Sequence, residues 1–271
     1  MRVIFHLSFF ASVGMILLFS ACRSTSDTLS TDPNLLPTGR EIVERFRAVQ
    51  GCQTMKVETR ARVTDEKGNE REFLIVTYQK CVDGTQYTLW RVISSEGEPA
   101  RVLLCIERPE GSVETVTYLP GFQKFVEIHD LGREDAIFGL SLQESVGDDD
   151  LYLYRTLGVE RLDQQDVYKV EGRLRKDADS RFARVITYYQ RETFLPLRQE
   201  LYNIRDDLVR IRRYVRWAPV DGHWTAMRTE IDNVRHRKHI VFETMTVESN
   251  VDWPLSFFDR EHLRNLTIGA Q

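Results

Sequence analysis

Short runs of alternating residues, separated by turn signals, fill most of the chain after Gly51 and constrain its fold more than any other feature. The run MKVETRARV, residues 55–63, alternates strictly between uncharged and charged side chains, as a strand in a sheet with one wet face requires. Turn dipeptides (DG, EG or PG) separate many of the later runs. The twelve further strand candidates are 70–80, 85–94, 100–107, 112–119, 122–129, 151–157, 166–174, 182–190, 197–203, 208–217, 223–232 and 238–248.

These runs predict one large antiparallel meander. About a dozen strands are too many for a flat sheet, so we expect the sheet to curl or close on itself. A length of 271 residues with 42% hydrophobic residues is compatible with one large domain. Pro120 and Gly121 suit the two central positions of a type II turn. Because that turn is disfavoured in a two-residue hairpin, we expect a bend or bulge there.

A helix is expected before the first strand. Residues 39–50, GREIVERFRAVQ, place Ile42, Val43, Phe46 and Val49 at the 3/4 spacing of an amphipathic helix. The next glycine provides its end.

The strand pattern is interrupted between residues 130 and 150, where Ile137, Phe138, Leu140 and Leu142 lie among glycines and acidic residues. This composition predicts a loop with a helical turn that packs against something apolar. Long loops of this kind are often functional lids. The alternative is that the segment plugs one end of the barrel as ordinary core.

The first 22 residues, MRVIFHLSFFASVGMILLFSAC, have the order of an export signal, with a basic residue, an apolar run and small residues before Cys22. LFSAC resembles a bacterial lipobox, which implies that residues 1–21 are removed and that Cys22 is acylated. The alternative is an ordinary signal peptide with a cysteine after its cleavage site. No other run approaches the ~18 apolar residues of a membrane-spanning helix.

Residues 22–37 are rich in Ser, Thr, Asp and Pro, which is typical of a solvated tether. The folded domain is then expected over 38–271, at the periplasmic side of a membrane. Several acyl chains would hold it there firmly, since one chain alone binds only reversibly. Arg23 stands where the best-known inner-membrane retention signal has Asp, so the outer membrane is favoured.

Three further cysteines, Cys52, Cys81 and Cys105, allow one disulfide in an oxidising compartment. If the DEKG turn pairs Thr64 with Asn69, counting back along the two strands puts Cys52 opposite Cys81. A slip of one residue would place them on opposite faces. The alternative is three buried small hydrophobic residues.

Most other function classes find no support. The net charge of −4 and a pI near 5.9 argue against nucleic-acid binding. No GxSxG motif, catalytic histidine arrangement or zinc-like Cys/His spacing occurs, so we expect neither an enzyme nor a metal or other cofactor. The basic run RHRKH, residues 235–239, could touch lipid phosphate or an acidic partner, or could be a solvated hairpin end. GDDD, residues 147–150, is more typical of a turn than of a calcium loop.

Large aromatic residues recur along the strands. Stripes at period two are normally core, yet one helix and a small lid are little cover for the concave face of so wide a sheet. Either large side chains fill that face or it encloses an apolar cavity.

Four segments together resemble one family. They are EGSVETVTYLPGFQKFVEI (110–128), FGLSLQES (138–145), ARVITYYQRETFLPLRQELYN (183–203) and the ending DGHW…FFDREHL (221–263). Their hairpin, lid, Pro-bend and closing patterns are similar to those of the LolA-like and LolB-like outer-membrane lipoprotein-sorting proteins, over roughly residues 70–266. Ser141 and Gln143 replace acidic residues of the family's lid motif, and Val116 or Thr117 replaces an aromatic residue before its Tyr-x-Pro.

The resemblance implies a mainly β fold: a strongly curved antiparallel half-barrel of about 11–12 strands with an N-terminal helix and a short helical lid. It also implies a hydrophobic cavity for the acyl chains of lipoproteins or lipids. Pattern and resemblance together select as cavity residues Trp90, Tyr118, Phe122, Phe125, Phe138, Leu140, Tyr152, Tyr154, Tyr188, Trp217, Met227 and Phe242.

Because an acylated protein cannot cross an aqueous gap alone, the expected role is that of a LolB-like acceptor, or of a lipid-binding factor at one membrane. We expect a monomer that binds acyl chains and the membrane, with a possible envelope protein partner and no nucleic acid. The rival is a non-enzymatic structural or interaction lipoprotein whose hollow is filled.

Overall fold

The computed structural model describes residues 36–50, 54–98, 100–128, 151–178 and 180–268. They belong to one compact unit, Leu36–Gln271. The predicted signal peptide, Cys22, Cys52 and the predicted lid with Phe138 and Leu140 lie outside the described residues.

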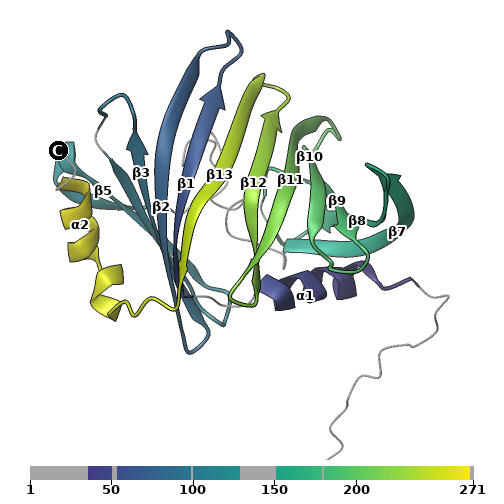
Figure 1. The fold of residues 1–271 in the computed structure, drawn as a ribbon, viewed down its shortest axis with the longest axis horizontal. Coiled ribbons are helices and arrows are strands. Elements are labelled where there is room, and N and C mark those ends of the chain that lie inside the picture. Colours follow the sequence, from purple (N-terminus) through teal and green to yellow (C-terminus); the bar gives the residue numbers. More distant parts are fainter. Residues whose placement is uncertain (1–35, 51–53, 99, 129–150, 179, 269–271) are drawn as a thin grey trace, which may run out of the picture. The chain divides into compact units, whose positions relative to one another are not determined.

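One open, curved antiparallel sheet of thirteen strands forms the body of this unit (Figure 1). Its order is β6-β5-β4-β3-β2-β1-β13-β12-β11-β10-β9-β8-β7, so β6 and β7 are the edges and the β1–β13 pair joins the two halves. The strands are β1 (Met55–Thr64), β2 (Glu70–Val82), β3 (Thr85–Ser94), β4 (Arg101–Glu107), β5 (Val113–Leu119), β6 (Lys124–Glu127), β7 (Tyr152–Leu162), β8 (Gln165–Leu174), β9 (Arg184–Gln190), β10 (Pro196–Tyr202), β11 (Leu208–Val220), β12 (His223–Asn233) and β13 (Lys238–Ser249).

All thirteen runs identified from the sequence are strands, which confirms the mainly β curved sheet; the resemblance alone underestimates the number by one or two. The expectation at Pro120–Gly121 is also confirmed. A short 3-10 turn, η1 (Pro120–Phe122), is followed by Gln123 with φ of 49°, and the flanking strands pair again at Leu119 and Lys124. The four-residue connection avoids the tight turn that would splay the strands.

Helix α1 (Gly39–Gln50) occupies the predicted residues. A capping box fixes its start: the Glu41 backbone N–H donates to Thr38 Oγ1 at 3.2 Å, and the Thr38 N–H donates to Glu41 Oε2 at 2.6 Å.

A C-terminal helix, α2 (Arg260–Ile268), follows the 3-10 turn η4 (Leu255–Phe258) and was not predicted. Its N-cap is Asp259, whose Oδ1 accepts the His262 N–H at 2.7 Å. Leu263 and Thr267 are buried against the sheet.

The two helices pack on opposite faces of the sheet. Residues paired directly across antiparallel strands share a face. One continuous face, here called the α1 face, includes the pairs Val170↔Thr187, Gln199↔Arg212 and Ile231↔Ile240. Val170 packs in the same cluster as Ile42 of α1. The other, the α2 face, includes Leu89↔Leu104, Leu104↔Val116 and Arg228↔Glu243.

The first hairpin has a different register from the one that the predicted disulfide was counted on. Thr64 pairs with Glu70 rather than with Asn69, because Asp65 and Asn69 close a five-residue loop. Asp65 Oδ1 accepts the N–H groups of Lys67 at 2.8 Å and of Asn69 at 2.9 Å. The assumed register is therefore wrong by one residue.

Candidate functional site

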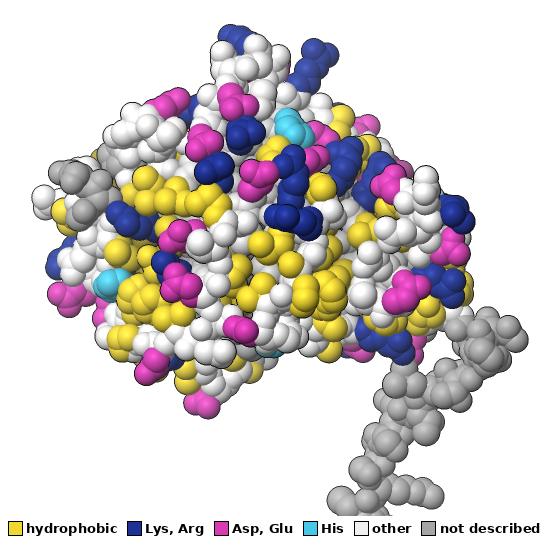
Figure 2. Space-filling model, viewed as in Figure 1, with side chains coloured by type: hydrophobic (Ala, Val, Ile, Leu, Met, Phe, Trp, Pro, Cys, Tyr) yellow, Lys and Arg dark blue, Asp and Glu magenta, His cyan; other side chains and the backbone are white. Residues whose placement is uncertain are grey.

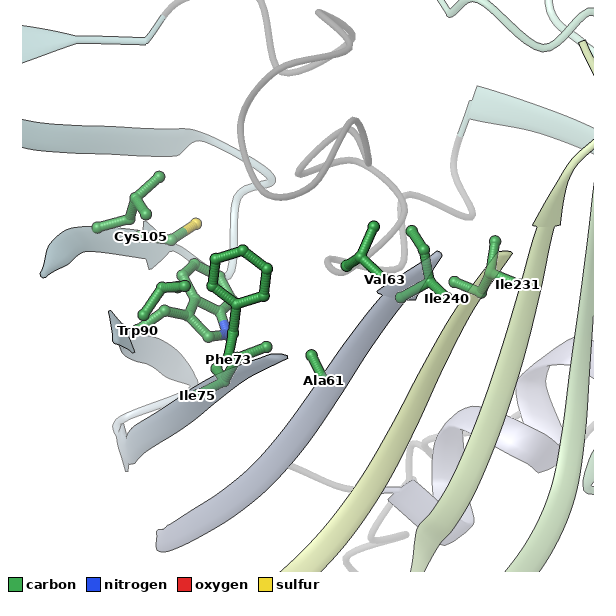
Figure 3. Packing of buried hydrophobic residues seen from close by; sticks show 10 residues of the cluster. Ala61, Val63, Phe73, Ile75, Trp90, Cys105, Ile231 and Ile240 are labelled. Atoms are coloured by element: carbon green, nitrogen blue, oxygen red, sulfur yellow. The ribbon is translucent and has the colours of Figure 1, made fainter. Parts of the chain in front are cut away.

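The central part of the α1 face carries an apolar surface whose buried members, among the described residues, all lie on strands (Figure 3). We call its ten buried residues the central cluster. Phe242 and Ile128 pack against it, half-buried. Neither described helix contributes a residue to the cluster, so the described elements that form it are six strands. Its members are Ala61, Val63, Phe73, Ile75, Trp90, Val92, Leu103, Cys105, Ile231 and Ile240.

Cross-strand register explains why these residues meet. Ala61 lies between Phe73 on β2 and Phe242 on β13, and Trp90 lies opposite Leu103 on β4. The small Ala61 side chain is fully buried and lies between two phenylalanines on the same face. Trp90, Phe73 and Cys105 lie close together in Figure 3, with Ile231 and Ile240 side by side further along the sheet.

Helix α1 covers the other part of the same face. Ile42 and Val43 are buried against Tyr168, Val170 and Tyr189 of β8 and β9. This cluster ties the N-terminal helix to the β7 end of the sheet.

An aromatic run continues from α1 toward the middle of the sheet. Phe46 meets Tyr189 at 6.1 Å and Trp217 edge-on at 6.3 Å, and Trp217 stacks on Tyr214 at 5.2 Å. The Trp217 Nε1–H donates to the Pro196 carbonyl at 2.9 Å, which satisfies its polar atom and fixes its ring.

Polar side chains lie between these two apolar regions of the α1 face. Arg210 is only 2% exposed, and its guanidinium lies 5.6 Å from the Phe182 ring. Arg212 donates to the Tyr214 hydroxyl at 3.3 Å, and Gln199 donates to Thr187 Oγ1 at 3.4 Å. The face is therefore amphipathic rather than uniformly apolar.

The part of the α2 face that lies beneath α2 is apolar. Under α2, residues of β3, β4 and β5 form a second apolar cluster that includes Leu89, Val116, Tyr118 and Leu263. The strands β3 to β5 are thus buried on both faces.

Ion pairs cover the middle of the α2 face. Arg228 pairs with both Glu230 and Glu243, and Arg213 pairs with Asp232. Figure 2 shows acidic and basic side chains interleaved on the upper part of the surface in that view, with hydrophobic side chains gathered below.

Five of the twelve predicted cavity residues lie on the α1 face. Trp90 is a member of the central cluster, and Phe242 packs against that cluster. Tyr154 packs in the α1 cluster, Trp217 contacts Phe46 of α1, and the Tyr152 hydroxyl donates to the Phe182 carbonyl at 2.9 Å.

Four of the others do not share that face. The rings of Tyr118 and Phe125 lie 5.0 Å apart and tilted by 55° in the cluster under α2, and Tyr188 lies on the α2 face opposite Arg198. Phe122 is 74% exposed at the η1 turn, where Lys124 lies over its ring. These four residues therefore do not lie on the same surface as Trp90, and their role in a cavity stays a prediction. Met227 is half-buried on β12.

Several residues of the α1 face were missed. Phe73, Ile231 and Ile240 are ordinary members of alternating strands, and Phe46 was assigned only to the helix. The period of two along each strand is the signal that could have identified them. Phe73 and Ile75 on one strand, or Ile240 and Phe242 on another, are two residues apart and therefore share a face.

Cys81 is disulfide-bonded, whereas Cys105 is free and buried. The partner of Cys81 lies outside the described residues, so its pairing with Cys52 stays a prediction. The Cys81 N–H donates to Thr54 Oγ1 at 3.2 Å, which holds the chain two residues after Cys52 beside Cys81. Burial raises the pKa of the Cys105 thiol to about 11 despite its contact with Thr115, so this thiol is poorly reactive.

Chemistry of other kinds has little basis in the described residues. Within them, no group of three His, Cys, Asp or Glu side chains is placed to hold a metal ion. His239 Nδ1 lies 2.7 Å from Asp232 Oδ1, but Asp232 is also paired with Arg213, so the contact belongs to the ion-pair network of the α2 face. Neither α1 nor α2, the helices of the described part, has the length and apolarity that crossing a membrane requires.

Comparison with known proteins places this arrangement among similar folds. A family model with the description "Uncharacterized protein" matches residues 84–265. No curated protein matches the chain.

Solved structures that share the fold include the following three. A DUF1329 family protein from Desulfovibrio piger is 21% identical, with 83% of this chain and 97% of that chain covered and a TM-score of 0.72. A domain from Vibrio parahaemolyticus, provisionally named as an outer membrane lipoprotein-sorting protein, is 16% identical over 83% and 98%, with a TM-score of 0.72. A LolA superfamily protein from Nitrosomonas europaea is 15% identical over 84% and 100%, with a TM-score of 0.67. The fold of the chain is LolA-like.

Proposed function

Because the chain belongs to the family whose model matches residues 84–265 and has a LolA-like fold, we propose that it is a membrane-anchored periplasmic lipoprotein that binds acyl chains. The acyl chains bind on its α1 face. The protein takes part in sorting lipoproteins, or lipids, to the outer membrane. One structure of the same fold carries a lipoprotein-sorting name, which supports this role.

The central cluster is the observation that carries the proposal. Six strands contribute apolar side chains to one continuous surface, and neither described helix supplies a residue to it. Half-buried Phe242 extends that surface toward the polar residues of β11. A surface that is apolar in the middle and polar beside it suits an amphiphile better than a fully apolar ligand.

Binding on this surface requires no covalent step. Each methylene transferred from water contributes about 0.8 kcal/mol, or about 25 cal/mol per Å2 of apolar area. A bound chain of a dozen carbons would therefore gain on the order of 10 kcal/mol before the entropy of binding is subtracted. Release then needs a competing apolar environment, such as a bilayer.

Acylation of Cys22 would make the protein an acceptor or lipid-binding factor at one membrane rather than a soluble shuttle. The start of the folded unit is fixed to the edge strand, where the Thr156 hydroxyl donates to the Pro37 carbonyl at 2.6 Å. Residues 22–35 would then form the tether between this point and the membrane. A Cys22→Ser protein should lose the acyl groups and partition into the aqueous phase.

The rival function is an envelope interaction protein whose α1 face is filled by its own side chains. The low exposure of the central cluster is compatible with that alternative. Residues 36–271 contain every hydrophobic cluster described above, so this unit is suited to a direct test. It would be purified, extracted and analysed for copurified lipid by mass spectrometry, and then titrated with a fluorescent fatty acid.

Two neighbouring residues of β13 make a matched pair for the titration. Phe242 lies on the α1 face and Val241 on the α2 face, opposite Glu230, and both are half-buried. Phe242→Lys should weaken fatty-acid binding at least tenfold, since one charge would lie on the apolar surface. Val241→Lys should bind as the parent does. Equal binding by both variants, or no lipid and no fluorophore bound to the parent, would favour the rival function.

A further inference from the structure

Two neighbouring hairpin tips carry similar short sequences, each with an aliphatic residue between Asn and Arg. Asn203-Ile204-Arg205 begins the turn between β10 and β11, and Asn233-Val234-Arg235 begins the turn between β12 and β13. The two hairpins lie side by side, because β11 pairs with β12 and the Val234 N–H donates to the Val209 carbonyl at 3.0 Å (Figure 1).

In both turns, the side chain of the asparagine accepts hydrogen bonds from backbone N–H groups that follow the exposed aliphatic residue. Asn203 Oδ1 accepts the N–H of Arg205 at 2.9 Å and of Asp207 at 3.0 Å, and Asn233 Oδ1 accepts the N–H of His236 at 3.2 Å. Ile204 is 90% exposed and Val234 is 45% exposed. Exposed aliphatic side chains therefore lie at two adjacent tips.

The same tips carry cations without acidic partners. Among the described residues, no hydrogen bond or ion pair involves the side chains of Arg205, Arg235 or Arg237. By contrast, the nearby Asp206 is already paired with Arg184 at 2.6 Å. The positive charge is therefore available to an outside partner.

Charge is distributed unevenly along these strands. The three turns at this end, 175–181, 203–207 and 233–239, contain seven lysines and arginines against four aspartates. The turns at the opposite end of the same strands, at 163–164, 191–195 and 221–222, contain three acidic residues and one arginine. The uneven charge gives this half of the sheet one basic end.

Acidic turns limit the surface on one side. The β1–β2 and β3–β4 turns lie at the same end of the sheet but carry four acidic residues, Asp65, Glu66, Glu96 and Glu98, against one lysine, Lys67. The basic, aliphatic surface is thus confined to the tips between β8 and β13, which we call the hairpin rim.

We propose that the hairpin rim docks the protein on an anionic phospholipid bilayer, with Arg235 and Arg237 at lipid phosphates and with Ile204 and Val234 inserted at the headgroup boundary. Cations and exposed aliphatic side chains act together in such contacts, because each alone is a weak membrane signal. The contact is independent of the proposed acyl binding and of any modification at Cys22. It would orient the sheet with its strands pointing at the membrane.

Flotation with vesicles tests the rim. Residues 36–271, which lack Cys22, would be mixed with vesicles of phosphatidylcholine, with or without phosphatidylglycerol, and spun through a sucrose gradient. An Arg235→Gln/Arg237→Gln protein should bind the anionic vesicles about 25-fold more weakly, at about fivefold for each cation near the surface. Ile204→Ser, which leaves the charge unchanged, should weaken binding about tenfold.

The matched control removes the same charge from the opposite end. Arg161→Gln/Arg191→Gln, beside the turns at 163–164 and 191–195, should float like the parent protein. Circular dichroism verifies that all variants are folded; their substituted side chains lie at or beside turns. Equal losses in both double variants, equal flotation with phosphatidylcholine alone, or no flotation of the parent would overturn the proposal. The last result would instead leave an acidic protein as the occupant of the rim.

Discussion

Gly39 offers a sharp test of how α1 is seated, because helix propensity and packing predict opposite effects there. It is the first residue of α1, and helix interiors favour Ala over Gly by about 0.5–1 kcal/mol, which is the upper bound for this position. In this structure, a Cβ on Gly39 would lie 2.6 Å from the Arg155 nitrogen and 2.8 Å from the Tyr154 carbonyl carbon. Both are backbone atoms of β7 and cannot rotate away.

The size of the effect follows from these distances. Carbon contacts are comfortable at about 3.5–4.0 Å, so α1 would have to retreat from β7 by roughly 1 Å. Overpacking of this kind costs about 1–3 kcal/mol, and the propensity gain offsets part of it. We expect Gly39→Ala to lower the free energy of unfolding by about 1–2 kcal/mol, or the melting temperature by about 2–8 °C for a unit of this size.

Gly121→Ala is the matched control. Nothing lies within 4 Å of a Cβ at Gly121, and its φ is not in the left-handed region. This substitution should leave the protein unchanged or stabilise it by up to about 1 kcal/mol. Urea and thermal unfolding of residues 36–271, followed by circular dichroism, would compare the two. A Gly39→Ala protein as stable as the Gly121→Ala protein would refute the contact between α1 and β7.

Further predictions concern charge and sulfur. Burial alone would raise the pKa of Glu171, but the ion pairs with Arg173 and Arg155 outweigh burial and hold that pKa below its ordinary 4.5. These ion pairs therefore stabilise the fold above pH 4.5. The stabilisation is lost as the pH falls through the lower pKa of Glu171 in the folded protein. The loss of stability caused by Glu171→Gln, measured by urea unfolding, should therefore be largest near pH 7 and shrink on the acid side of 4.5; a loss independent of pH would contradict this. Cys105 should resist iodoacetamide in the native protein and react once urea unfolds it, as mass spectrometry of the alkylated protein would report; rapid native labelling would contradict its burial. Peptide mapping without reduction should recover Cys81 linked to Cys52, and a link from Cys81 to any other cysteine would exclude the predicted pairing.

The strands were predictable because turn chemistry and alternation are local signals. The run 70–80 became β2 (Glu70–Val82) and the run 223–232 became β12 (His223–Asn233), within two residues at each end. Register was not predictable in the same way. It depends on how many residues the loop uses, and Asp65 closes a five-residue loop where a shorter turn was assumed.

The face of each strand was the harder question. Alternation orders residues within one strand but does not relate strands across irregular connections or bulges, such as the one between Glu58 and Thr59. The run RVLLC of β4 is apolar at consecutive positions, because Leu103 faces the central cluster and Leu104 faces α2. Strands that are buried on both faces lose the alternation of apolar and polar residues. Without it, the sequence does not indicate that Trp90 and Tyr118 lie on opposite faces.

The C-terminal helix explains why half of this burial was missed. Asp259 as N-cap, with Leu263 and Thr267 one turn apart on the same face, is a recognisable helix signal within α2. That segment had been assigned only to the closing of the sheet. The sequence analysis does not recognise α2 and therefore groups the residues beneath it, Tyr118 and Phe125, with Trp90 as cavity residues.

Photo-crosslinking most directly tests whether acyl chains bind on the α1 face. Residues 36–271 would be saturated with a fatty acid that carries a photoreactive group near its methyl end, irradiated, digested and sequenced by mass spectrometry. If acyl chains bind there, adducts should form on the α1-face residues of β1, β2, β12 and β13, including Phe73, Ile240 and Phe242, and excess unlabelled fatty acid should prevent them. Adducts confined to the cluster under α2, or adducts that unlabelled fatty acid does not reduce, would contradict binding on the α1 face.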